Sequence, residues 1–459
     1  MRDRILGLDR ETPLLDGSTV TYVNLDNGAS SPPMIDSVNA LNDFMPYYSS
    51  VHRGTGFKSR LSTRIFDEAR EIIAQFVKAD LTSNTVIFGK NASEAINKLA
   101  HSLPSGDDCV VITTRMEHHS NDLPWRDHFK VVYADILPDG RLDEDDFDRK
   151  LAKHKDNLVL VAITGAANVT GYIQPIHRLA RKVHEAGSLI LVDAAQLAPH
   201  REIDMKPDDD PEHLDFIVLA GHKMYAPYGT GVLIGPKHAF LNHSPDYSGG
   251  GTVSVVTSNK VYWAGLPDKE EAGSPNVAGA IALAASALAL MNYTMKRVEE
   301  HEVILTKYAL NRLKEVPGMI IYGESDPDKL DRVGVIPFNI KGVLHSLLAA
   351  VLGYEGGIGV RSGCFCAHPY VVSLLSLSDM ETESWKDEFL AGDKSNMPGM
   401  VRMSLGCYST KEDVDRLIVM LKKVAAGDYA GKYEVVKSTG EYAPSGYLEP
   451  FGQYFKFNR

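Results

Sequence analysis

A carboxylate and an amine each follow an apolar run. Asp193 comes directly after residues 189–192, with Gln196 three positions later, and Lys223 lies shortly after residues 216–219. Pyridoxal phosphate chemistry needs a lysine amine that forms a Schiff base and a carboxylate that keeps the pyridine nitrogen protonated. The Gln196 amide can hydrogen-bond the ring phenolate. Taken singly, residues like Asp193 and Lys223 are more often a loop carboxylate and a solvated surface lysine, and only their conjunction favours the chemistry.

The runs that would position these residues predict an α/β fold. Seven short apolar runs alternate with helix-like stretches, a pattern typical of a mostly parallel sheet covered by helices. The runs are residues 85–88, 110–113, 131–134, 158–163, 189–192, 216–219 and 231–234. Because ligands bind at the carboxyl ends of parallel strands, we expect Asp193 and Lys223 to face one site.

Helical spacing and composition divide the remainder of the chain. Apolar residues recur at helical spacing over residues 62–79, with Ser62 and Thr63 as candidate caps, and residues 277–291 predict a buried helix. From about residue 295 the pattern changes to a charged helix, a strand at 333–339 and a terminal helix at 411–426. We therefore predict an N-terminal segment (1–30) packed with the small domain, a large α/β domain (31–294), a small α+β domain (295–426) and an aromatic C-terminal extension (427–459).

Composition excludes several classes of protein. The chain has 459 residues, 48 Lys and Arg against 60 Asp and Glu, a net charge of −12 and only 4 Cys. A negative chain without a basic run repels nucleic acid and anionic lipid, so we expect neither as a partner. With few cysteines and no apolar N-terminal segment or membrane-length run, we expect a reduced cytoplasmic protein.

Further motifs extend the pattern over residues 22–422. The chain resembles the class V branch of fold-type I PLP enzymes, and within it the cysteine desulfurase/selenocysteine lyase group. The segments that carry this resemblance are residues 25–30, 51–54, 93–97, 117–119, 168, 193–196, 221–223, 272–276, 334–336, 360–363, 366 and 401–405. The resemblance implies a large domain with a mostly parallel seven-stranded sheet and a smaller α+β domain.

The resemblance also implies a set of residues that bind pyridoxal 5'-phosphate. His118 would stack on the ring as a neutral imidazole that can transfer protons, and Asn168 would lie beside the phenolate. The phosphate would be held at a helix start. The residues implied for the cofactor are Ala92, Ser93, His118, Asn168, Asp193, Gln196, His222, Lys223 and Ser274, with Ser274 reaching the partner subunit of a homodimer. Ala220 stands where the family usually has a phosphate-binding Ser.

Cys366 decides the predicted reaction. In the resembling enzymes the cysteine at this position takes sulfur from L-cysteine as a persulfide and L-alanine leaves, with Lys223 moving the Cα proton. Arg402 would grip the substrate carboxylate, for which a planar guanidinium is suited, and Arg361 and Ala29 would line the same site. No metal site is expected. A sulfur-acceptor protein is a further expected partner.

Three alternatives are weighed at this point. A non-catalytic binding module on this scaffold is disfavoured because the Asp, Lys, His, Gln and Arg set is complete. Another class V PLP enzyme, such as a C–S lyase or transaminase, could use a different amino acid and leave Cys366 unused. A nucleotide-dependent dehydrogenase is disfavoured because no strand is followed by Gly-x-Gly-x-x-Gly.

The polar stretch 376–398 and the tail are additions to the family pattern. The first could be a lid or a surface elaboration, and the aromatic density of the tail predicts that it docks onto another surface, such as a partner subunit.

Overall fold

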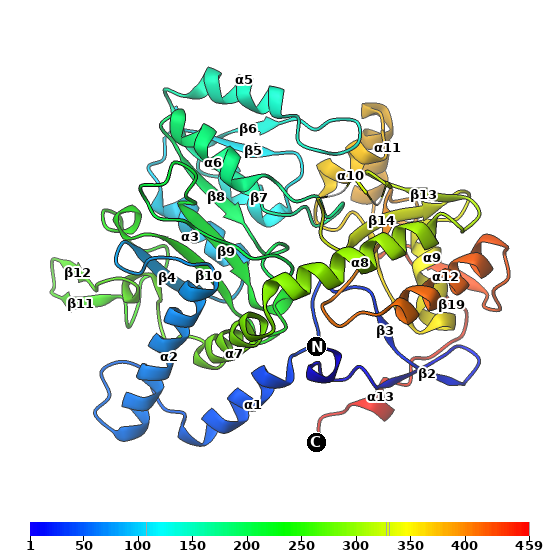
Figure 1. Ribbon diagram of the computed structural model, residues 1–459, viewed down its shortest axis with the longest axis horizontal. Coiled ribbons are helices and arrows are strands. Elements are labelled where there is room, and N and C mark those ends of the chain that lie inside the picture. Colours follow the sequence, from blue (N-terminus) through cyan, green and yellow to red (C-terminus); the bar gives the residue numbers. More distant parts are fainter. Residues whose placement is uncertain (107, 327, 330, 459) are drawn as a thin grey trace.

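The computed structural model describes residues 1–106, 108–326, 328–329 and 331–458. Its centre is a seven-stranded sheet in the order β4-β10-β9-β8-β7-β5-β6 (Figure 1). The strands are β4 (Asn84–Gly89), β5 (Val110–Thr114), β6 (Lys130–Ala134), β7 (Leu158–Thr164), β8 (Leu189–Asp193), β9 (Phe216–Ala220) and β10 (Gly231–Pro236). All seven predicted strands are confirmed. The sheet is parallel except for β10, which is antiparallel to both neighbours.

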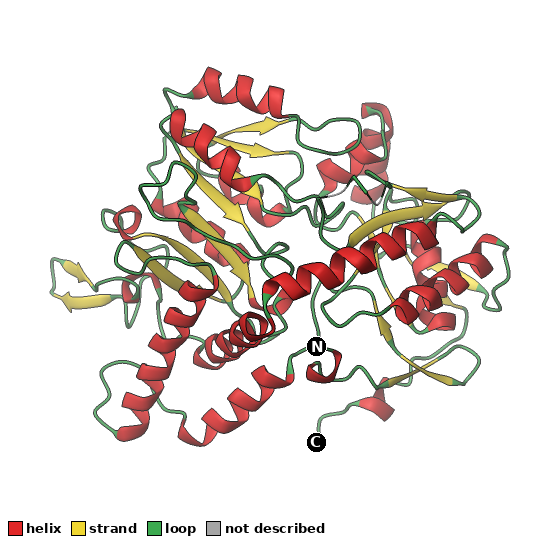
Figure 2. Cartoon of the chain, in the orientation of Figure 1, coloured by secondary structure: helices red, strands yellow, loops and turns green. Residues whose placement is uncertain are grey.

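Alternate residues of the strands build two apolar layers. Ile190 and Val192 of β8 belong to one cluster, whereas Leu191 belongs to the cluster on the opposite face. Both faces are therefore covered, which explains why the strands read as continuous apolar runs. Figure 2 shows helices on both sides of the sheet. α2 (Phe57–Phe76), α5 (Glu144–His154), α6 (Ile176–Glu185) and α7 (Val277–Tyr293) pack in the first cluster, and α3 (Ala92–Ser102) and α4 (Leu123–Arg126) in the second.

α2 begins at Phe57 rather than at the predicted Ser62. The two expected cap hydroxyls lie inside the helix, where Thr63 Oγ1 donates to the Ser59 carbonyl (2.9 Å) and Ser62 Oγ accepts from the Ser49 N–H (3.0 Å). Hydroxyls that bond in this way do not compete with the helix. The predicted caps were wrong because the helix already begins after Gly56, which leaves both hydroxyls inside it.

A third apolar cluster surrounds a four-stranded sheet in the order β13-β14-β17-β16. Its strands are β13 (Met319–Ile321), β14 (Val335–Ile340), β16 (Arg361–Gly363) and β17 (Met400–Ser404), and the helices around it are α8 (Met295–Leu313), α9 (His345–Gly356) and α12 (Lys411–Ala425). α8 joins the first and the third cluster, because Met295 packs in the first and Leu310 in the third. Figure 1 shows α8 running from the large sheet to the small one.

The N-terminal residues contact the first and the third cluster. β1 (Glu11–Pro13) pairs with β2 (Thr19–Thr21), and β3 (Val23–Asn24) pairs in parallel with β15 (Ile358–Gly359) of the smaller unit. Ile5, in contrast, packs in the first cluster and bridges to Met34 just before α1 (Ile35–Phe44). The proposed domain boundaries at residues 30, 294 and 426 stay a prediction.

The insertion and the tail contact each other. The stretch 376–398 follows α10 (His368–Leu374) and contains α11 (Asp379–Leu390). The tail folds into β18 (Tyr433–Val436), β19 (Glu441–Pro444) and α13 (Phe451–Tyr454). Tyr433 donates its hydroxyl to Glu355 of α9 (2.9 Å), and the Lys394 N–H donates to the Lys437 carbonyl (2.8 Å). The tail therefore docks onto its own chain.

The remaining two-stranded sheet is a hairpin of β11 (Val253–Val256) and β12 (Val261–Trp263), which carries exposed Val255, Val256 and Tyr262. Among the described residues, no single helix has both the length and the apolar character of a membrane span. α7 and α8 meet that test only together, as a pair bent by 76°.

Candidate active site

A cavity of about 350 Å³ lies at the carboxyl ends of β8 and β9. It brings together every predicted site residue except Ser274. Those residues are Ala29, Ala92, Ser93, His118, Asn168, Asp193, Gln196, His222, Lys223, Arg361, Cys366 and Arg402. They come from positions spread between residues 29 and 402, so only the folded chain assembles them. Their individual roles stay predictions.

Asp193 and Lys223 have the environment that the predicted chemistry needs. Asp193 is 5% exposed, and its Oδ1 accepts from the Ala195 N–H (3.0 Å). Burial raises the pKa of Asp193 because it disfavours the charged carboxylate. A cationic group bound in the cavity would stabilise that carboxylate. The Lys223 Nζ lies 3.4 Å from Gln196 Oε1, and burial lowers the pKa of this amine to about 8 despite the opposing charge of Asp193. The alternative of two solvated surface groups is excluded.

The start of α3 forms a cradle for an anion. The Asn91 side chain caps the helix by accepting from the Glu94 N–H (2.9 Å). The N–H groups of Ala92 and Ser93 donate to no acceptor within the described part of the chain. These free donors lie at the positive end of the helix dipole, which favours a phosphate. A Cβ on Gly231 would stand 2.6 Å from the Ala92 nitrogen, so this glycine lets β10 approach the helix start.

A short polar chain links the cradle to His118. Ser120 Oγ lies 2.5 Å from Ser93 Oγ and 3.0 Å from His118 Nδ1. Burial, together with the charge of nearby Lys223, lowers the pKa of His118 to about 3, so its ring is neutral at physiological pH. Burial also lowers the pKa of His222 to about 4. Ser120 was not predicted, although it lies two positions from His118.

Asn168 connects the cavity to the segment that carries Cys366. Its Nδ2 donates to the Phe365 carbonyl (2.7 Å), and the His119 N–H donates to the Cys366 carbonyl (2.7 Å). Phe365 (φ 53°) and Cys366 (φ 54°) both adopt the left-handed conformation, which costs a non-glycine residue about 1–3 kcal/mol. These hydrogen bonds hold the strained turn that exposes Cys366 to the cavity.

Asn168 Oδ1 also bears on cofactor binding. It is a buried acceptor with no donor within the described residues. A bound group with an N–H or O–H at this point would satisfy it. The free N–H pair of α3 and the buried Asp193 fit a phosphorylated pyridine cofactor, whereas a phenolate offers this oxygen no donor.

Cys364 differs sharply from Cys366. Its side chain is buried, and its Sγ lies 3.2 Å from the Pro398 carbonyl. Burial, reinforced by the neighbouring Cys366, raises the pKa of Cys364 to about 12, so it remains a protonated thiol at neutral pH. Thiolates are the nucleophiles in sulfur chemistry. Of the two cysteines in this segment, Cys366 is the one placed to react.

Arg402 lies on β17 with only 2% of its surface exposed. Its Nη1 donates to the Asn168 carbonyl (2.8 Å), and its Nη2 lies 3.4 Å from Asp26 Oδ1. The same carboxylate pairs with Arg361 through Asp26 Oδ2 (2.7 Å). Burial lowers the pKa of Arg402 to about 10, so it remains cationic near neutrality. Two guanidinium groups share one carboxylate, which leaves a net positive charge for an anionic substrate group. Asp26 was not singled out from the sequence, although it lies within the recognised segment 25–30.

Ser274 is the predicted site residue that the cavity does not contain. It lines a different cavity, of about 320 Å³, with His52, Arg53 and Gly251 among its neighbours. It is absent from the lining of the cavity that contains the start of α3. Ala220 lines the main cavity, so the site lacks the hydroxyl that the family usually has there.

Comparison with known proteins agrees with this geometry. Residues 23–417 match the family described as Aminotransferase class-V. The chain is 36% identical to a "Probable cysteine desulfurase" of Halalkalibacterium halodurans over 427 residues, covering 91% of this chain and 95% of that protein. It is 32% identical to a "Cysteine desulfurase" of Haloferax volcanii over 428 residues, covering 91% and 92%.

Solved structures give the same result. The apo structure of cysteine desulfurase from Thermococcus onnurineus superposes with a TM-score of 0.76 at 30% identity, covering 88% of this chain and 95% of that one. The cysteine desulfurase CsdA of Escherichia coli, in an S-sulfonic acid form, superposes with a TM-score of 0.74 at 27% identity, covering 94% and 98%.

Proposed function

This chain belongs to the aminotransferase class-V family, and from that membership and the geometry of the cavity we propose that it is a PLP-dependent cysteine desulfurase. The proposed reaction takes L-cysteine and the Cys366 thiol to L-alanine and a Cys366 persulfide. The observation that carries the proposal is the convergence of Lys223, Asp193, Arg402 and Cys366 on one cavity.

Pyridoxal 5'-phosphate, when bound, supplies an aldehyde for the substrate amine and a protonated ring that accepts the Cα electrons. The start of α3 would hold its phosphate, and Asp193 would keep its ring nitrogen protonated. His118, neutral at working pH, would stack on the ring. Arg402 would bind the substrate carboxylate, with Arg361 beside it, and so fix Cα near Lys223.

The remaining steps use two side chains. The Lys223 amine, whose lowered pKa keeps a large fraction neutral near pH 8, would remove the Cα proton. The Cys366 thiolate would then attack the substrate sulfur. A new S–S bond forms and the substrate Cβ–S bond breaks, its electrons staying on carbon, which takes up protons and leaves as alanine. Sulfur is conserved, because one cysteine and one thiol give one alanine and one persulfide.

The test is an assay of the cofactor-loaded protein with L-cysteine and a thiol reductant. We expect alanine and sulfide in equal amounts, loss of both in Cys366→Ala, and near-normal rates in Cys364→Ala, in which the buried thiol is removed. Wild-type rates in Cys366→Ala would instead indicate the alternative class V enzyme that does not use this thiol. No alanine from the loaded wild-type protein would refute the desulfurase function. A parallel assay with L-selenocysteine compares the two substrates.

We propose further that the protein is a homodimer with shared sites. Ser274 lies outside the cavity of its own chain, and the nearby β11–β12 hairpin exposes Val255, Val256 and Tyr262. A partner that covered this region would bury the hairpin and bring Ser274 to the partner's phosphate.

We also propose that the persulfide passes to a thiol of an acceptor protein in the cytoplasm. The four cysteines Cys109, Cys364, Cys366 and Cys407 are free thiols. Cys366 is the exposed one, so it is accessible to an external acceptor.

A further inference from the structure

The insertion 376–398 has no part in the proposed reaction. Its helix α11 has 12 residues, and none of them is buried. Met380 near its start and Leu390 at its end are 83% and 73% exposed. Figure 1 shows α11 beside α10 at the periphery of the molecule. A helix of this length without a buried face is only marginally stable in water, so contact with another surface would stabilise it.

One side of α11 rests against the segment that carries Cys366. The ring centroid of Trp385 lies 5.7 Å from that of His368, the first residue of α10. His368 Nδ1 lies 3.0 Å from His119 Nε2, and the His119 N–H donates to the Cys366 carbonyl (2.7 Å). The side chain of His368 and the residue His119 therefore link α11 to the turn of Cys366.

The last residues of the insertion lie against the same segment. The Pro398 carbonyl is 3.2 Å from Cys364 Sγ, and the Met397 carbonyl is 2.9 Å from His345 Nε2. Of the four cysteines, Cys366 is the exposed one. The insertion is thus anchored on both sides of α11, and this helix stands beside the thiol that an external acceptor must reach.

The charge of α11 is strongly negative. The helix contains five acidic residues against one lysine, a net charge of −4. Lys386 pairs with Glu383, and Glu388 accepts from the Asn396 amide (3.3 Å). An exposed acidic surface attracts a basic partner and repels an acidic one, most strongly at low ionic strength.

We propose that α11 is the docking surface for a sulfur-acceptor protein whose reactive thiol is surrounded by basic residues. The inference rests on the proposed desulfurase function and names the kind of acceptor. The acceptor thiolate would attack the outer sulfur of the Cys366 persulfide. A new S–S bond forms on the acceptor and the S–S bond to Cys366 breaks. Its electrons stay on Cys366 as a thiolate, so the transfer needs no further oxidant or reductant.

Sulfur transfer to two synthetic peptides tests the proposal. The cofactor-loaded protein is first given sulfur-labelled L-cysteine and freed of the excess, and then receives a cysteine peptide rich in either lysine or glutamate. The α11 variant combines Glu383→Gln, Asp387→Asn and Glu388→Gln. We expect it to pass label to the lysine peptide roughly fivefold more slowly than the wild type at low salt. The difference should vanish at roughly 1 M salt, where charges are screened.

The glutamate peptide should not be slowed by the same substitutions, because they remove charges that repel it. Lysines also make the peptide thiol itself more reactive, since nearby cations favour the thiolate. The comparison is therefore made between protein variants with one and the same peptide.

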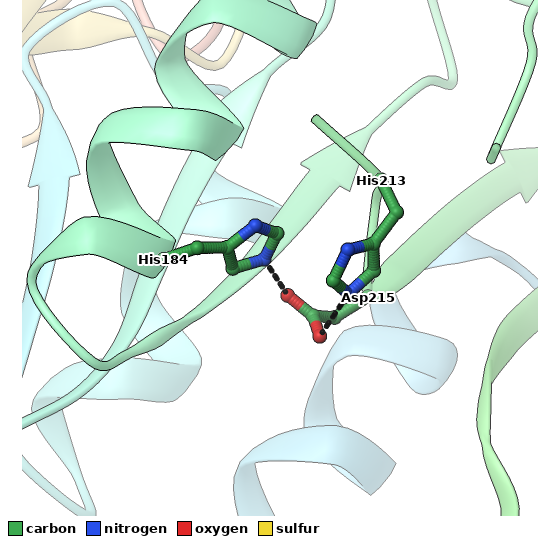
Figure 3. A group of neighbouring side chains, drawn as sticks. All are labelled: His184, His213 and Asp215. Carbon is green, nitrogen blue, oxygen red and sulfur yellow. Dashed lines mark hydrogen bonds and ion pairs between the residues drawn. The ribbon is translucent and has the colours of Figure 1, made fainter. Parts of the chain in front are cut away.

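The matched control removes three exposed charges at the other end of the seven-stranded sheet. It combines Glu185→Gln, Asp208→Asn and Asp209→Asn, which lie near the two histidines that pair with Asp215 (Figure 3). Asp215 directly precedes β9, whereas Lys223 follows the carboxyl end of that strand. The control should transfer label to the lysine peptide within about twofold of the wild-type rate. Alanine release with a small thiol reductant should be the same in all three proteins.

Binding is measured separately from chemistry, with a fluorescent lysine peptide in which serine replaces the cysteine. Its dissociation constant should rise in the α11 variant and not in the control. Equal transfer and equal binding by wild type and α11 variant would overturn the proposal. So would an α11 variant that binds the peptide normally but has a changed molar mass in light scattering, because α11 would then face a second copy of this chain. Failure of Cys366 to take up label would refute the desulfurase function alone, since peptide binding still tests the docking surface.

Discussion

At the residue scale, Asp26 sets the charge of the substrate end of the cavity. It pairs with half-exposed Arg361 at 2.7 Å and lies 3.4 Å from buried Arg402. A second carboxylate there would neutralise both cations, whereas one leaves a positive charge available to the substrate. The Arg402 Nε, which has no hydrogen-bond partner within the described residues, is a further donor.

Arg402→Lys tests this assignment. A lysine keeps the charge but loses the planar fork, so one charge-assisted hydrogen bond of about 1.5–3 kcal/mol is lost. We expect kcat/KM for L-cysteine to fall roughly 10- to 150-fold while the visible absorbance of the bound cofactor is unchanged. Arg416→Lys, which alters an arginine bonded to the Thr21 and Gly356 carbonyls, should leave kcat/KM near the wild-type value. Loss of the cofactor absorbance in Arg402→Lys would argue against a substrate role.

The lowered pKa of Lys223 predicts how cofactor loading depends on pH. Only a neutral amine attacks an aldehyde, and burial lowers the pKa of Lys223 from 10.5 to about 8. The neutral fraction rises from about one per cent at pH 6 to about a half at pH 8. We therefore expect the rate at which cofactor-free protein gains visible absorbance to rise through this range and level off above pH 8. A rate that keeps rising to pH 10, or absorbance in Lys223→Ala, would contradict the assignment.

At the element scale, helix α8 is tied to the segment that follows β8 by a buried charge cluster. Glu302 of α8 contacts His200 Nδ1 and binds Arg201 Nη1 (2.7 Å). His200 Nε2 lies 3.5 Å from the Gln196 amide, which in turn approaches Lys223. This charge cluster therefore links α8, which packs in the first and the third apolar cluster, to residues that line the cavity.

Glu302→Gln should destabilise the protein. It leaves the buried Arg201 without its carboxylate, which typically costs about 3–5 kcal/mol. Urea unfolding at pH 7 measures the free energy of unfolding. The matched control is Glu299→Gln, because half-exposed Glu299 lies 3.5 Å from the same arginine and should contribute less than about 1 kcal/mol.

The same variant has a predicted pH dependence. Burial alone raises the pKa of Glu302, but His200 and Arg201 outweigh it and hold the pKa below the ordinary 4.5. A lowered folded-state pKa means that this stabilisation is present above pH 4.5 and is lost as the pH falls below it. The difference between wild type and Glu302→Gln should shrink below pH 4.5. A difference that is constant with pH would show that packing, not charge, causes the loss.

At the scale of the whole molecule, the cavity of the candidate active site is lined by residues from both the seven-stranded and the four-stranded sheet. Asp193 ends β8 of the seven-stranded sheet, Lys223 lies in the turn after β9, and Arg402 comes from the four-stranded sheet. α8 packs in the first and the third cluster and so spans the two sheets. Ser274 lies outside this cavity. In the proposed dimer it would reach into the cavity of the partner subunit.

Mixed dimers test the shared site. Ser274→Ala dimers should bind the cofactor about tenfold more weakly, because each phosphate loses one hydrogen bond of about 1.5 kcal/mol. Mixing with Lys223→Ala chains gives hybrids in which the intact Lys223 site receives Ser274 from the other chain. That site should recover wild-type affinity in an absorbance titration. If the hybrid site stays as weak as in the Ser274→Ala dimer, the serine serves its own chain or none.

The sequence by itself determined the seven strands, several of the long helices and the strand-end positions of Asp193 and Lys223. Apolar periodicity and the geometry of parallel sheets are local or general properties, and the family resemblance placed His118, Cys366 and Arg402 in one site. Only the tertiary structure decided the start of α2, the sharing of Asp26 by two arginines, the bond from Asn168 to Phe365 and the meeting of His184 with His213 and Asp215. These contacts join side chains that are distant in sequence, and their partners depend on packing and strand register, which no short stretch of sequence encodes.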